Sequence, residues 1–522
     1  MKSNKSSSPA GIRWWPMALI IILDIVMLVW VWFFKETIRQ EKVINTMFFQ
    51  IAAALLLLIW LLFLSRLRWK VRLFSFSAVI LFALIFVSLF RFREFSGDIV
   101  PIFEWRWSEK PALAENHLSA KHTMAETVHK VDVKGAFDYP QFLGPTRDSK
   151  IKGVKLARDW DINPPSLIWK QPIGEGWSSF AVVGDRAITQ EQRREQEAVV
   201  CYQLLSGDVI WIHSDQTRYE TVLAGVGPRA TPTVDAERVY TLGATGILNC
   251  LDLDTGKRVW HTDIVKDNQA QVAMYGMSSS PLVLDSLVIV SAGGTQNRSL
   301  VSYHKLTGEQ IWTAGTDRAG YSSPMIAGIA GVRQILIFND GQVVAHRPTD
   351  GRVLWKYPWP SQTENVAQPV VLPNDRVLIT SGYSVGSKLL TIDKLSDGSL
   401  SPTLIWESNR LKAKFTNVVY HEGYVYGLDD GILVCLDVSN GKRTWKRGRY
   451  GHGQLILVNN LLIIQAESGE VALVEANPDA FKELARFQAI EGKTWNNPAL
   501  SGPYLLVRNS QEAACYELPV IK

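Results

Sequence analysis

Hydrophobic and polar positions follow two different patterns along this chain of 522 residues. Three nearly uninterrupted apolar runs come first, at Trp15–Phe34, Met47–Leu64 and Leu73–Phe90. Each run is long enough to cross the hydrocarbon core of a bilayer as a helix. From about residue 141 onward, short segments alternate between apolar and polar residues, and this period of two predicts half-buried strands. The pattern therefore predicts a helical membrane anchor followed by an all-β domain.

A short phrase recurs within the β region: a turn glycine, three further residues and a tryptophan. Its copies are Gly207–Trp211, Gly256–Trp260, Gly308–Trp312, Gly351–Trp355 and Gly441–Trp445. Glycine accepts positive φ without steric cost, so each phrase predicts a tight hairpin turn that leads into a strand with a large apolar ring. Self-similarity at a fixed period indicates a repeat array.

A second marker, usually a small polar pair followed by proline, begins each run of β-branched residues. Its eight copies start at Ser178, Ala230, Ser279, Ser322, Ala367, Phe415, His452 and Asn496. About four strands in a unit of roughly 40–50 residues describe a propeller blade. We therefore predict an eight-bladed β-propeller over residues 141–522. The last blade lacks an outer strand, and Ser166–Trp169 is expected to supply it and close the ring.

These phrases resemble the repeats of pyrroloquinoline-quinone-type (quinoprotein alcohol dehydrogenase-like) β-propellers over about residues 140–520, most specifically along Gly227–Trp260. The resemblance implies that the repeated tryptophan docks between neighbouring blades. It assigns this role to Trp169, Trp211, Trp260, Trp312, Trp355, Trp406 and Trp445. Burial of one such ring removes roughly 150–250 Å² from water, which at about 25 cal/mol per Å² amounts to several kcal/mol per blade. We expect these tryptophans to be structural.

Lysine and arginine placement predicts the orientation in the membrane. The N-terminal tail carries Lys2, Lys5 and Arg13, and the loop after the second span carries four basic residues between Arg66 and Arg72. Cytoplasmic loops are enriched in such residues, so the N-terminus is expected inside and the propeller outside, in a bacterial inner membrane with the propeller in the periplasm. The predicted parts are a cytoplasmic tail (1–13), a three-helix anchor (14–90), a linker (91–140) and the propeller (141–522).

Two features of the membrane half leave alternatives open. Asp24 lies in the middle of the first span, where a carboxyl costs about 2.5–3.5 kcal/mol, so it is expected to face other helices. It is either a coupling or partner-binding residue or a protonated acid bonded to a serine or backbone carbonyl of a neighbouring span, and the second interpretation is favoured. In the linker, Trp105–Trp107 either rests on the membrane surface or is a set of exposed aromatics.

The cysteines occupy one recurrent position. Cys201, Cys250 and Cys435 each lie ten residues before the tryptophan of their blade, and Cys515 holds the corresponding place in the last blade. Equivalent positions in adjacent blades should be about 10 Å apart, which is too far for a disulfide, so four reduced core cysteines are expected. No spacing typical of metal ligands is present, and no metal site is predicted. The net charge of +5 comes largely from the membrane flanks and does not indicate nucleic acid.

The residues just before each strand start are expected to surround one mouth of the central channel. They are Trp177, Arg229, Ser278, Tyr321, Val366, Lys414, His452 and Trp495. Six of them are candidate cofactor-binding residues because three potential cations and three aromatics could hold a flat polyanion such as pyrroloquinoline quinone: Trp177, Arg229, Tyr321, Lys414, His452 and Trp495. The preceding loop Gly174–Trp177 would let the backbone approach closely.

The resemblance implies two functions. Quinoprotein dehydrogenases carry large insertions, an acidic and amide set for calcium and a catalytic aspartate, whereas this chain has compact blades and no residues that can be placed in those roles. Other propellers with these repeats, such as the lipoprotein of the outer-membrane barrel assembly machinery, are scaffolds. The favoured prediction is a non-catalytic, membrane-anchored propeller that binds proteins or envelope material and needs no cofactor. The alternative is a quinone- and calcium-dependent membrane dehydrogenase that oxidises an alcohol or a sugar.

Overall fold

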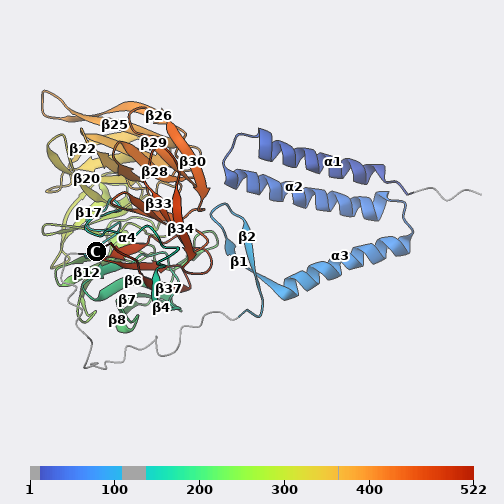
Figure 1. Cartoon of the computed structure of the whole chain (residues 1–522), viewed down its shortest axis with the longest axis horizontal. Helices are drawn as coiled ribbons and strands as arrows, with labels where there is room; N and C mark the ends of the chain where they lie inside the picture. The colour runs from blue at the N-terminus through green and yellow to red at the C-terminus, as the bar shows by residue number, and fades with distance from the viewer. Residues whose placement is uncertain (1–11, 109–136, 362–363, 522) are drawn as a thin grey trace, which may run out of the picture. The chain divides into compact units, whose positions relative to one another are not determined.

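The computed structural model describes residues 12–108, 137–361 and 364–521. These residues form two compact units, Met1–Lys110 and Pro111–Lys522. The first contains the three long helices and a β-hairpin, and the second contains the larger β-sheets (Figure 1). Most of the predicted cytoplasmic tail, including Lys2 and Lys5, lies outside the described residues, as does much of the predicted linker.

Three helices of the first unit are long and apolar enough to span a membrane: Trp15–Phe34, Arg39–Leu64 and Trp69–Leu89. They consist of α1 (Trp15–Val29) with a final π-helical turn η1 (Trp30–Phe34), α2 (Arg39–Ile59) with η2 (Trp60–Leu64), and α3 (Trp69–Leu89). Most of their large apolar side chains are exposed, as expected for surfaces that face lipid. The three predicted spans are confirmed, although the second and third begin earlier than their apolar runs.

Asp24 bonds to the neighbouring span. Gln50 Nε2, on α2, donates to Asp24 Oδ2 over 2.9 Å. A glutamine amide thus replaces the serine or backbone carbonyl that was expected as its partner. Interhelical hydrogen bonds of this kind join membrane helices, which supports the structural interpretation of Asp24.

A β-hairpin follows α3 directly, within the segment expected to be an irregular linker. Strands β1 (Phe90–Phe95) and β2 (Pro101–Trp105) pair antiparallel, with Phe90 opposite Trp105 and Phe92 opposite Phe103. The alternation of phenylalanine and arginine from Phe90 to Arg93 is the period-two signal that identifies this hairpin in the sequence.

Eight propeller blades are present among the described residues of the second unit, as predicted. From the innermost strand outward, blade one consists of β5 (Ala181–Val183), β6 (Arg186–Arg193), β7 (Gln196–Gln203) and β8 (Val209–Asp215), and blade two consists of β11 (Thr233–Asp235), β12 (Arg238–Leu242), β13 (Ile247–Asp252) and β14 (Arg258–Asp263). Blade three consists of β15 (Leu282–Leu284), β16 (Leu287–Gly294), β17 (Arg298–His304) and β18 (Gln310–Ala314), and blade four consists of β19 (Met325–Ile329), β20 (Val332–Asn339), β21 (Gln342–His346) and β22 (Val353–Pro358). A short helix, α4 (Ile264–Asp267), follows blade two.

Blades five to eight continue the same order. They are β23 (Val370–Leu372), β24 (Arg376–Ser381), β25 (Gly386–Lys394), β26 (Leu400–Ser408); β27 (Val419–His421), β28 (Tyr424–Asp429), β29 (Ile432–Asp437), β30 (Arg443–Arg449); β31 (Gln454–Val458), β32 (Leu461–Gln465), β33 (Glu470–Glu475), β34 (Glu483–Gln488); and β35 (Ala499–Ser501), β36 (Tyr504–Arg508), β37 (Glu512–Glu517), β4 (Ser166–Pro172).

The ring closes where the two ends of the propeller meet. Strand β4 pairs with β37, with Cys515 opposite Trp169, so the expected closure by Ser166–Trp169 is confirmed. The buried Arg508 of blade eight donates to the carbonyls of Gly174 and Gln190, each over 3.0 Å, on the blade-one side. Burial lowers the pKa of Arg508 to about 10. This guanidinium therefore joins blade eight to blade one through backbone oxygens.

The repeated tryptophans dock on the following blade. In six blades the indole Nε1 donates to a carbonyl near the next turn, over 2.8–3.1 Å: Trp169 to Leu204, Trp211 to Leu253, Trp260 to Lys305, Trp312 to Pro348, Trp406 to Val438 and Trp445 to Asn477. In five of these pairs a turn glycine also lies against the ring; a Cβ on Gly256, for instance, would meet Trp211 at 2.4 Å. The turn glycine is thus required by packing as well as by its φ.

Trp355 departs from the expected docking. Its Nε1 donates to Gln334 of its own blade over 2.6 Å. Trp359, four residues later, donates instead to Ser381 Oγ of blade five over 2.9 Å. The turn of blade five contains an insertion, because Trp406 follows Gly398 by eight residues and not by four, and a Cβ on Gly398 would meet nothing within 4 Å. Trp355 packs between the blades, but its N–H does not cross the interface.

The small polar pairs form a second ring, around the channel. A backbone N–H of one blade donates to the polar side chain of the next from Ser179 onward, with acceptors Thr231, Ser280, Ser323, Gln368, Asn417 and Gln454. Gln454 then donates to the carbonyl of Trp495, and Ser179 Oγ donates to the carbonyl of Asn497. Each blade thereby satisfies a buried donor of its neighbour, which explains why a polar residue recurs at this position.

The four cysteines are buried and free, as expected. Each lies opposite the docking tryptophan of its blade, such as Cys250 opposite Trp260. Ser302 and Ala345 hold the same register in blades three and four. Burial raises the pKa of Cys250 to about 11 and that of Cys515 to about 12, so these thiols stay protonated at neutral pH.

Residues 137–151, here the axial segment, cross the propeller axis and reach every blade. Tyr139 pairs with Val182 of blade one, and its neighbour Pro140 accepts from Val234 of blade two. Arg147 donates to the carbonyls of Ser280 and Pro281 in blade three. The segment lines a cavity together with Met325–Gly328 and Pro369–Val371 of blades four and five, and it lies against Tyr420, Leu457–Val458 and Gly502 of blades six to eight.

The axial segment covers the channel mouth opposite the strand starts. Its strand β3 (Lys150–Ile151) pairs parallel to β31. Leu143, Arg147 and Ser149 have φ between 55° and 60°, which is uncommon outside glycine and is held here by contacts with the blades. A cavity of about 230 Å³ remains between this segment and blades four to six. No periodic pattern marks the segment, so the sequence did not predict its position.

Candidate functional site

Three of the six candidate residues meet in an aromatic cluster at the mouth where the strands start. The ring centroids of Trp177 and Trp495 are 5.0 Å apart. Phe415 joins them, with its centroid 4.8 Å from Trp495 and 4.8 Å from His452. Phe415 marked a strand start in the sequence but was not predicted as a site residue.

Two lysines lie over these rings. Lys493 Nζ is 4.2 Å from the ring centroid of Trp495 and 5.1 Å from that of Trp177. Lys414 Nζ is 5.1 Å from the centroid of Tyr383 and 5.5 Å from that of Phe415. Both lysines are buried, and desolvation strengthens a cation–π contact. Lys493 was missed, although its place two residues before Trp495 is the signal that could have found it.

Arg229 lies on the other side of Trp177. Its guanidinium is 5.1 Å from the ring centroid of Tyr219, and Nη2 donates to the carbonyl of Gly225 over 3.0 Å. Trp177 Nε1 donates to the adjacent carbonyl of Ala224 over 2.5 Å. Both candidates therefore bond to the small hairpin of β9 (Glu220–Thr221) and β10 (Gly225–Val226). Burial lowers the pKa of Arg229 to about 10.

Tyr321 occupies a third position. Its hydroxyl accepts from the backbone N–H of Tyr275 over 3.3 Å, and the two ring centroids are 5.8 Å apart. Ser278 Oγ donates to the carbonyl of Tyr321 over 3.3 Å. Val366 is half-buried in the next blade start. The strand-start rule thus placed these residues around one mouth, but only Trp177, Trp495 and His452 share a ring cluster.

Two carboxylates that were not predicted support the mouth. Glu467 accepts from Trp495 Nε1 over 2.9 Å and from the backbone N–H of His452 over 3.0 Å. Glu197 accepts from the backbone N–H of Ala244 over 3.0 Å, and burial raises its pKa to about 7. Both bond to backbone or indole N–H groups, so their role in this arrangement is to hold the wall of the mouth.

The observed geometry does not fit a flat quinone between the aromatic rings. A planar ligand needs about 3.5 Å on each face, so two flanking rings must be roughly 7 Å apart. The ring centroids of Trp177 and Trp495 are 5.0 Å apart, and the two rings contact each other at a tilt of 35°. The lysines are stacked on rings of the same cluster.

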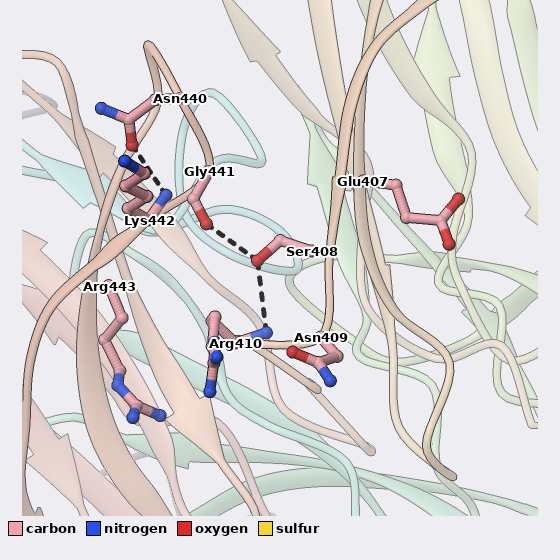
Figure 2. A pocket seen from close by; sticks show the side chains of 8 residues that line it. All are labelled: Glu407, Ser408, Asn409, Arg410, Asn440, Gly441, Lys442 and Arg443. Atoms are coloured by element: carbon pink, nitrogen blue, oxygen red, sulfur yellow. Dashed lines mark hydrogen bonds between the residues drawn. The ribbon is translucent and has the colours of Figure 1, made fainter.

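A surface recess between blades five and six has a different character (Figure 2). It measures about 790 Å³ and is lined by Glu407, Ser408, Asn409, Arg410, Asn440, Gly441, Lys442 and Arg443. Ser408 Oγ donates to the carbonyl of Gly441 over 2.8 Å and holds the two walls together. Figure 2 shows Arg410 and Arg443 extending in the same direction from opposite walls.

The cations of this recess are exposed and make no ion pair with any described residue: Arg410, Lys442 and Arg443. Some exposed cations elsewhere on the propeller are paired, such as Arg333 with Asp285 over 2.8 Å, and others, such as Lys257 and Arg352, are unpaired among the described residues but do not lie together in a recess. The recess was not predicted. Its walls come from two blades, and a repeat pattern predicts where each blade lies in the ring but not how the side chains of neighbouring blades are oriented.

Comparison with known proteins supports the repeat type. A family model described as "Outer membrane protein assembly factor BamB" matches residues 195–447. The protein of that name from Shewanella oneidensis is 22% identical over 370 residues, which cover 59% of this chain and 89% of the relative. The "Quinoprotein alcohol dehydrogenase PedH" of Pseudomonas putida is 26% identical over 143 residues, covering 25% of this chain and 23% of the relative.

A solved structure titled "Europium-containing methanol dehydrogenase" has the same fold, with a TM-score of 0.57 and 13% identity over 74% of this chain and 99% of that chain. The chain thus combines three candidate membrane spans with a β-propeller whose repeats are similar to those of the matched family.

Proposed function

We propose that this chain is a membrane-anchored envelope scaffold whose propeller binds a protein partner through the basic recess between blades five and six. The observation that carries the proposal is the set of three exposed cations without an ion pair, Arg410, Lys442 and Arg443. The likeness to outer membrane protein assembly factors supports a role in the assembly of other proteins. The positive-inside pattern supports a propeller on the periplasmic side of the inner membrane.

The chemistry of the recess favours an acidic partner segment. Arginine presents a planar fork that binds carboxylates through two hydrogen bonds, and two arginines face the same space. Basic charges on an edge strand also prevent strands of other molecules from pairing, which could explain Arg443 on β30. That reason does not apply to Arg410 and Lys442, which lie outside any strand.

Charge reversal tests the proposal. The variant Arg410→Glu/Lys442→Glu/Arg443→Glu is compared with Lys257→Glu/Arg352→Glu, which changes exposed residues directly after the turn glycines of blades two and four. The full-length protein is cross-linked in its native membrane, and the cross-linked partners are quantified. We expect the recess variant to lose a salt-sensitive partner that the control variant retains. Equal recovery by both variants, or equal loss, would contradict the proposal.

One observation keeps the dehydrogenase alternative testable. Arg229 Nη1 is buried and has no hydrogen-bond partner among the described residues, as a donor awaiting an anionic ligand would be. Titration of the purified full-length protein with pyrroloquinoline quinone, with and without calcium, measures this directly. Saturable binding that weakens in Arg229→Ala or Lys414→Ala would favour the dehydrogenase. Absence of binding at high micromolar quinone would contradict the dehydrogenase and favour the scaffold.

A further inference from the structure

The hairpin β1–β2 presents two chemically different faces. One face carries Phe90, Phe92, Phe103 and Trp105, whose rings contact one another at centroid distances of 5.4 Å for Phe90–Trp105 and 6.1 Å for Phe92–Phe103. The other face carries an ion-pair network in which Arg91 bonds Glu104, and Arg93 lies 3.3 Å from Glu94 and 3.8 Å from Glu104. The charged groups thus neutralise one another, while the aromatic groups lie together.

In this hairpin the aromatic side chains are more exposed than the charged ones, which is the reverse of what is expected for a hairpin in water. Phe92 is 45% exposed, Phe103 46% and Trp105 45%, whereas the side chains of Glu94 and Glu104 are only 15% and 20% exposed. Trp107, just after β2, is 62% exposed. A contiguous exposed aromatic surface of this kind marks an interaction site in a protein that is otherwise well packed.

The base of the hairpin is bonded to the C-terminal end of α3, and its tip is bonded to the N-terminal end of α2. At its base, Phe90 directly follows α3, and Arg106 returns to α3 by donating its backbone N–H to Leu89 over 2.8 Å and its Nη2 to Val87 over 2.6 Å. At its tip, Asp98 is 2.9 Å from Arg39 Nε, at the start of α2. The hairpin therefore lies across the helix ends instead of projecting away from them, as Figure 1 shows.

The same helix ends carry further aromatic residues. Trp30 and Trp32 lie in η1, with Lys35 Nζ 5.9 Å from the ring of Trp30 and the Arg39 guanidinium 5.7 Å from that of Trp32. Tryptophan with flanking basic residues is enriched at the level of the lipid head groups, where an amphipathic ring meets both apolar chains and water. Arg39 links these residues to the hairpin, because the same side chain lies over Trp32 and pairs with Asp98 at the hairpin tip.

We propose that the hairpin is an interfacial anchor, whose aromatic face lies in the head-group region of the same bilayer that α1–α3 cross. Its occupant is the boundary between phospholipid head groups and acyl chains. Two observations favour lipid: the peptide chain passes without interruption from α3 into β1, and Arg39 joins the hairpin tip to the tryptophan-bearing end of the first span. The anchor would hold the first residues after the last span in the plane of the membrane.

Position-specific fluorescence tests this anchor. The environment-sensitive dye NBD is attached to Phe92→Cys, Phe103→Cys or, as the matched control on the opposite face, Glu104→Cys of the full-length protein. The four native cysteines are buried and should not react under native conditions. The proteins are reconstituted in phosphatidylethanolamine and phosphatidylglycerol vesicles that contain a nitroxide at carbon 5 or carbon 12 of the acyl chain. We expect blue-shifted emission and several-fold stronger quenching by the carbon-5 nitroxide at Phe92 and Phe103 than at Glu104.

Each other outcome would overturn the anchor. Emission at Phe92 and Phe103 like that at Glu104, with quenching by aqueous iodide, would place the face in water. Stronger quenching by the carbon-12 nitroxide would place it deep in the membrane. Protection from both nitroxides and iodide would show that protein covers it. Because a cysteine at Phe103 could loosen the hairpin, the same measurement at Trp107→Cys, beyond the strand and more exposed, provides an independent reading.

Discussion

Two interfaces between blades use the same residue types in different ways. Between blades two and three, Trp260 donates to the carbonyl of Lys305, and Gly308 packs on its ring. Between blades four and five, Trp355 bonds within its own blade, and a Cβ on the turn glycine Gly398 would meet nothing within 4 Å. The docking unit is therefore the tryptophan of one blade together with the turn of the next, and an insertion in the turn removes half of it.

Other contacts replace the missing half at the irregular interface. Trp359 donates to Ser381, and Lys388 Nζ of blade five is 5.4 Å from the ring centroid of Trp359. The backbone N–H of Ala330 also donates to Asp375 Oδ1 over 2.6 Å. The irregular interface depends on side-chain partners, whereas the regular one depends on backbone carbonyls and glycines. Substitutions should therefore affect the two interfaces differently.

The largest difference is expected from the turn glycines. Gly256→Ala would place a Cβ 2.4 Å from the Trp211 ring at a φ of +66°, so strain and overpacking together should cost about 2–5 kcal/mol. Gly398→Ala also places alanine at a positive φ, but its Cβ would meet no neighbouring atom, so it should cost only about 1–2 kcal/mol. The midpoints of urea denaturation, followed by tryptophan fluorescence, measure both. Equal losses would mean that φ alone explains the recurrence of glycine.

A double-mutant cycle tests the replacement contact. Trp359→Phe and Ser381→Ala should be coupled by about 1 kcal/mol, because the indole N–H and the serine hydroxyl bond directly across the interface. Trp355→Phe combined with Ser381→Ala should be additive, since Trp355 donates to Gln334. The same denaturation assay applies to all six proteins. Coupling of Ser381 to Trp355 instead would contradict the assignment of this inter-blade hydrogen bond to Trp359.

Acid should weaken the regular interface between blades three and four. His346 Nδ1 bonds to the carbonyl of Gly351, the glycine that packs on Trp312, and burial lowers the pKa of this histidine. The unfolded chain therefore binds a proton more readily, and stability is lost as the pH falls below about 6.5. His346→Gln should flatten the dependence of the thermal midpoint on pH between 7 and 5. An unchanged profile would indicate that His346 protonates without cost.

The smallest effect is expected at Lys388. Its ammonium lies over Tyr357 and Trp359 of blade four at 5.8 Å and 5.4 Å, and a partly exposed cation–π contact contributes about 0.5–1 kcal/mol. Lys388→Met keeps the apolar stem and should lower the denaturation midpoint slightly, while Lys388→Arg should restore it. If methionine is as stable as lysine, packing of the stem accounts for the contact.

Much of the fold was predictable because each blade repeats local requirements. The glycine–tryptophan spacing and the polar pairs identified eight blades, and the missing strand of the last blade identified β4. Three features were not predictable in this way. The acceptor of Trp355 depends on where the longer turn of blade five lies, the axial segment 137–151 makes contacts that do not repeat from blade to blade, and the distance between the rings of Trp177 and Trp495 depends on rotamers.

The candidate site shows the same division. Position before a strand start was enough to place Trp177, Trp495 and His452 around one mouth, and their binding role stays a prediction. Phe415 and Lys493, which fill the space between them, precede no strand start at the expected position and were missed. A repeat pattern thus predicts where residues lie around the axis, but it does not predict which side chains occupy the volume between them.

The mixed origin of blade eight has a consequence for biogenesis. Strand β4 emerges from the ribosome early, yet its partner β37 ends at Glu517, about 350 residues later in the chain. Arg508, which joins the two ends, is also synthesised late. Until then the nascent propeller is an open arc that exposes β4 and the edge of blade one. A folding helper that shields exposed strand edges would be needed during that interval and would be released once the ring closes.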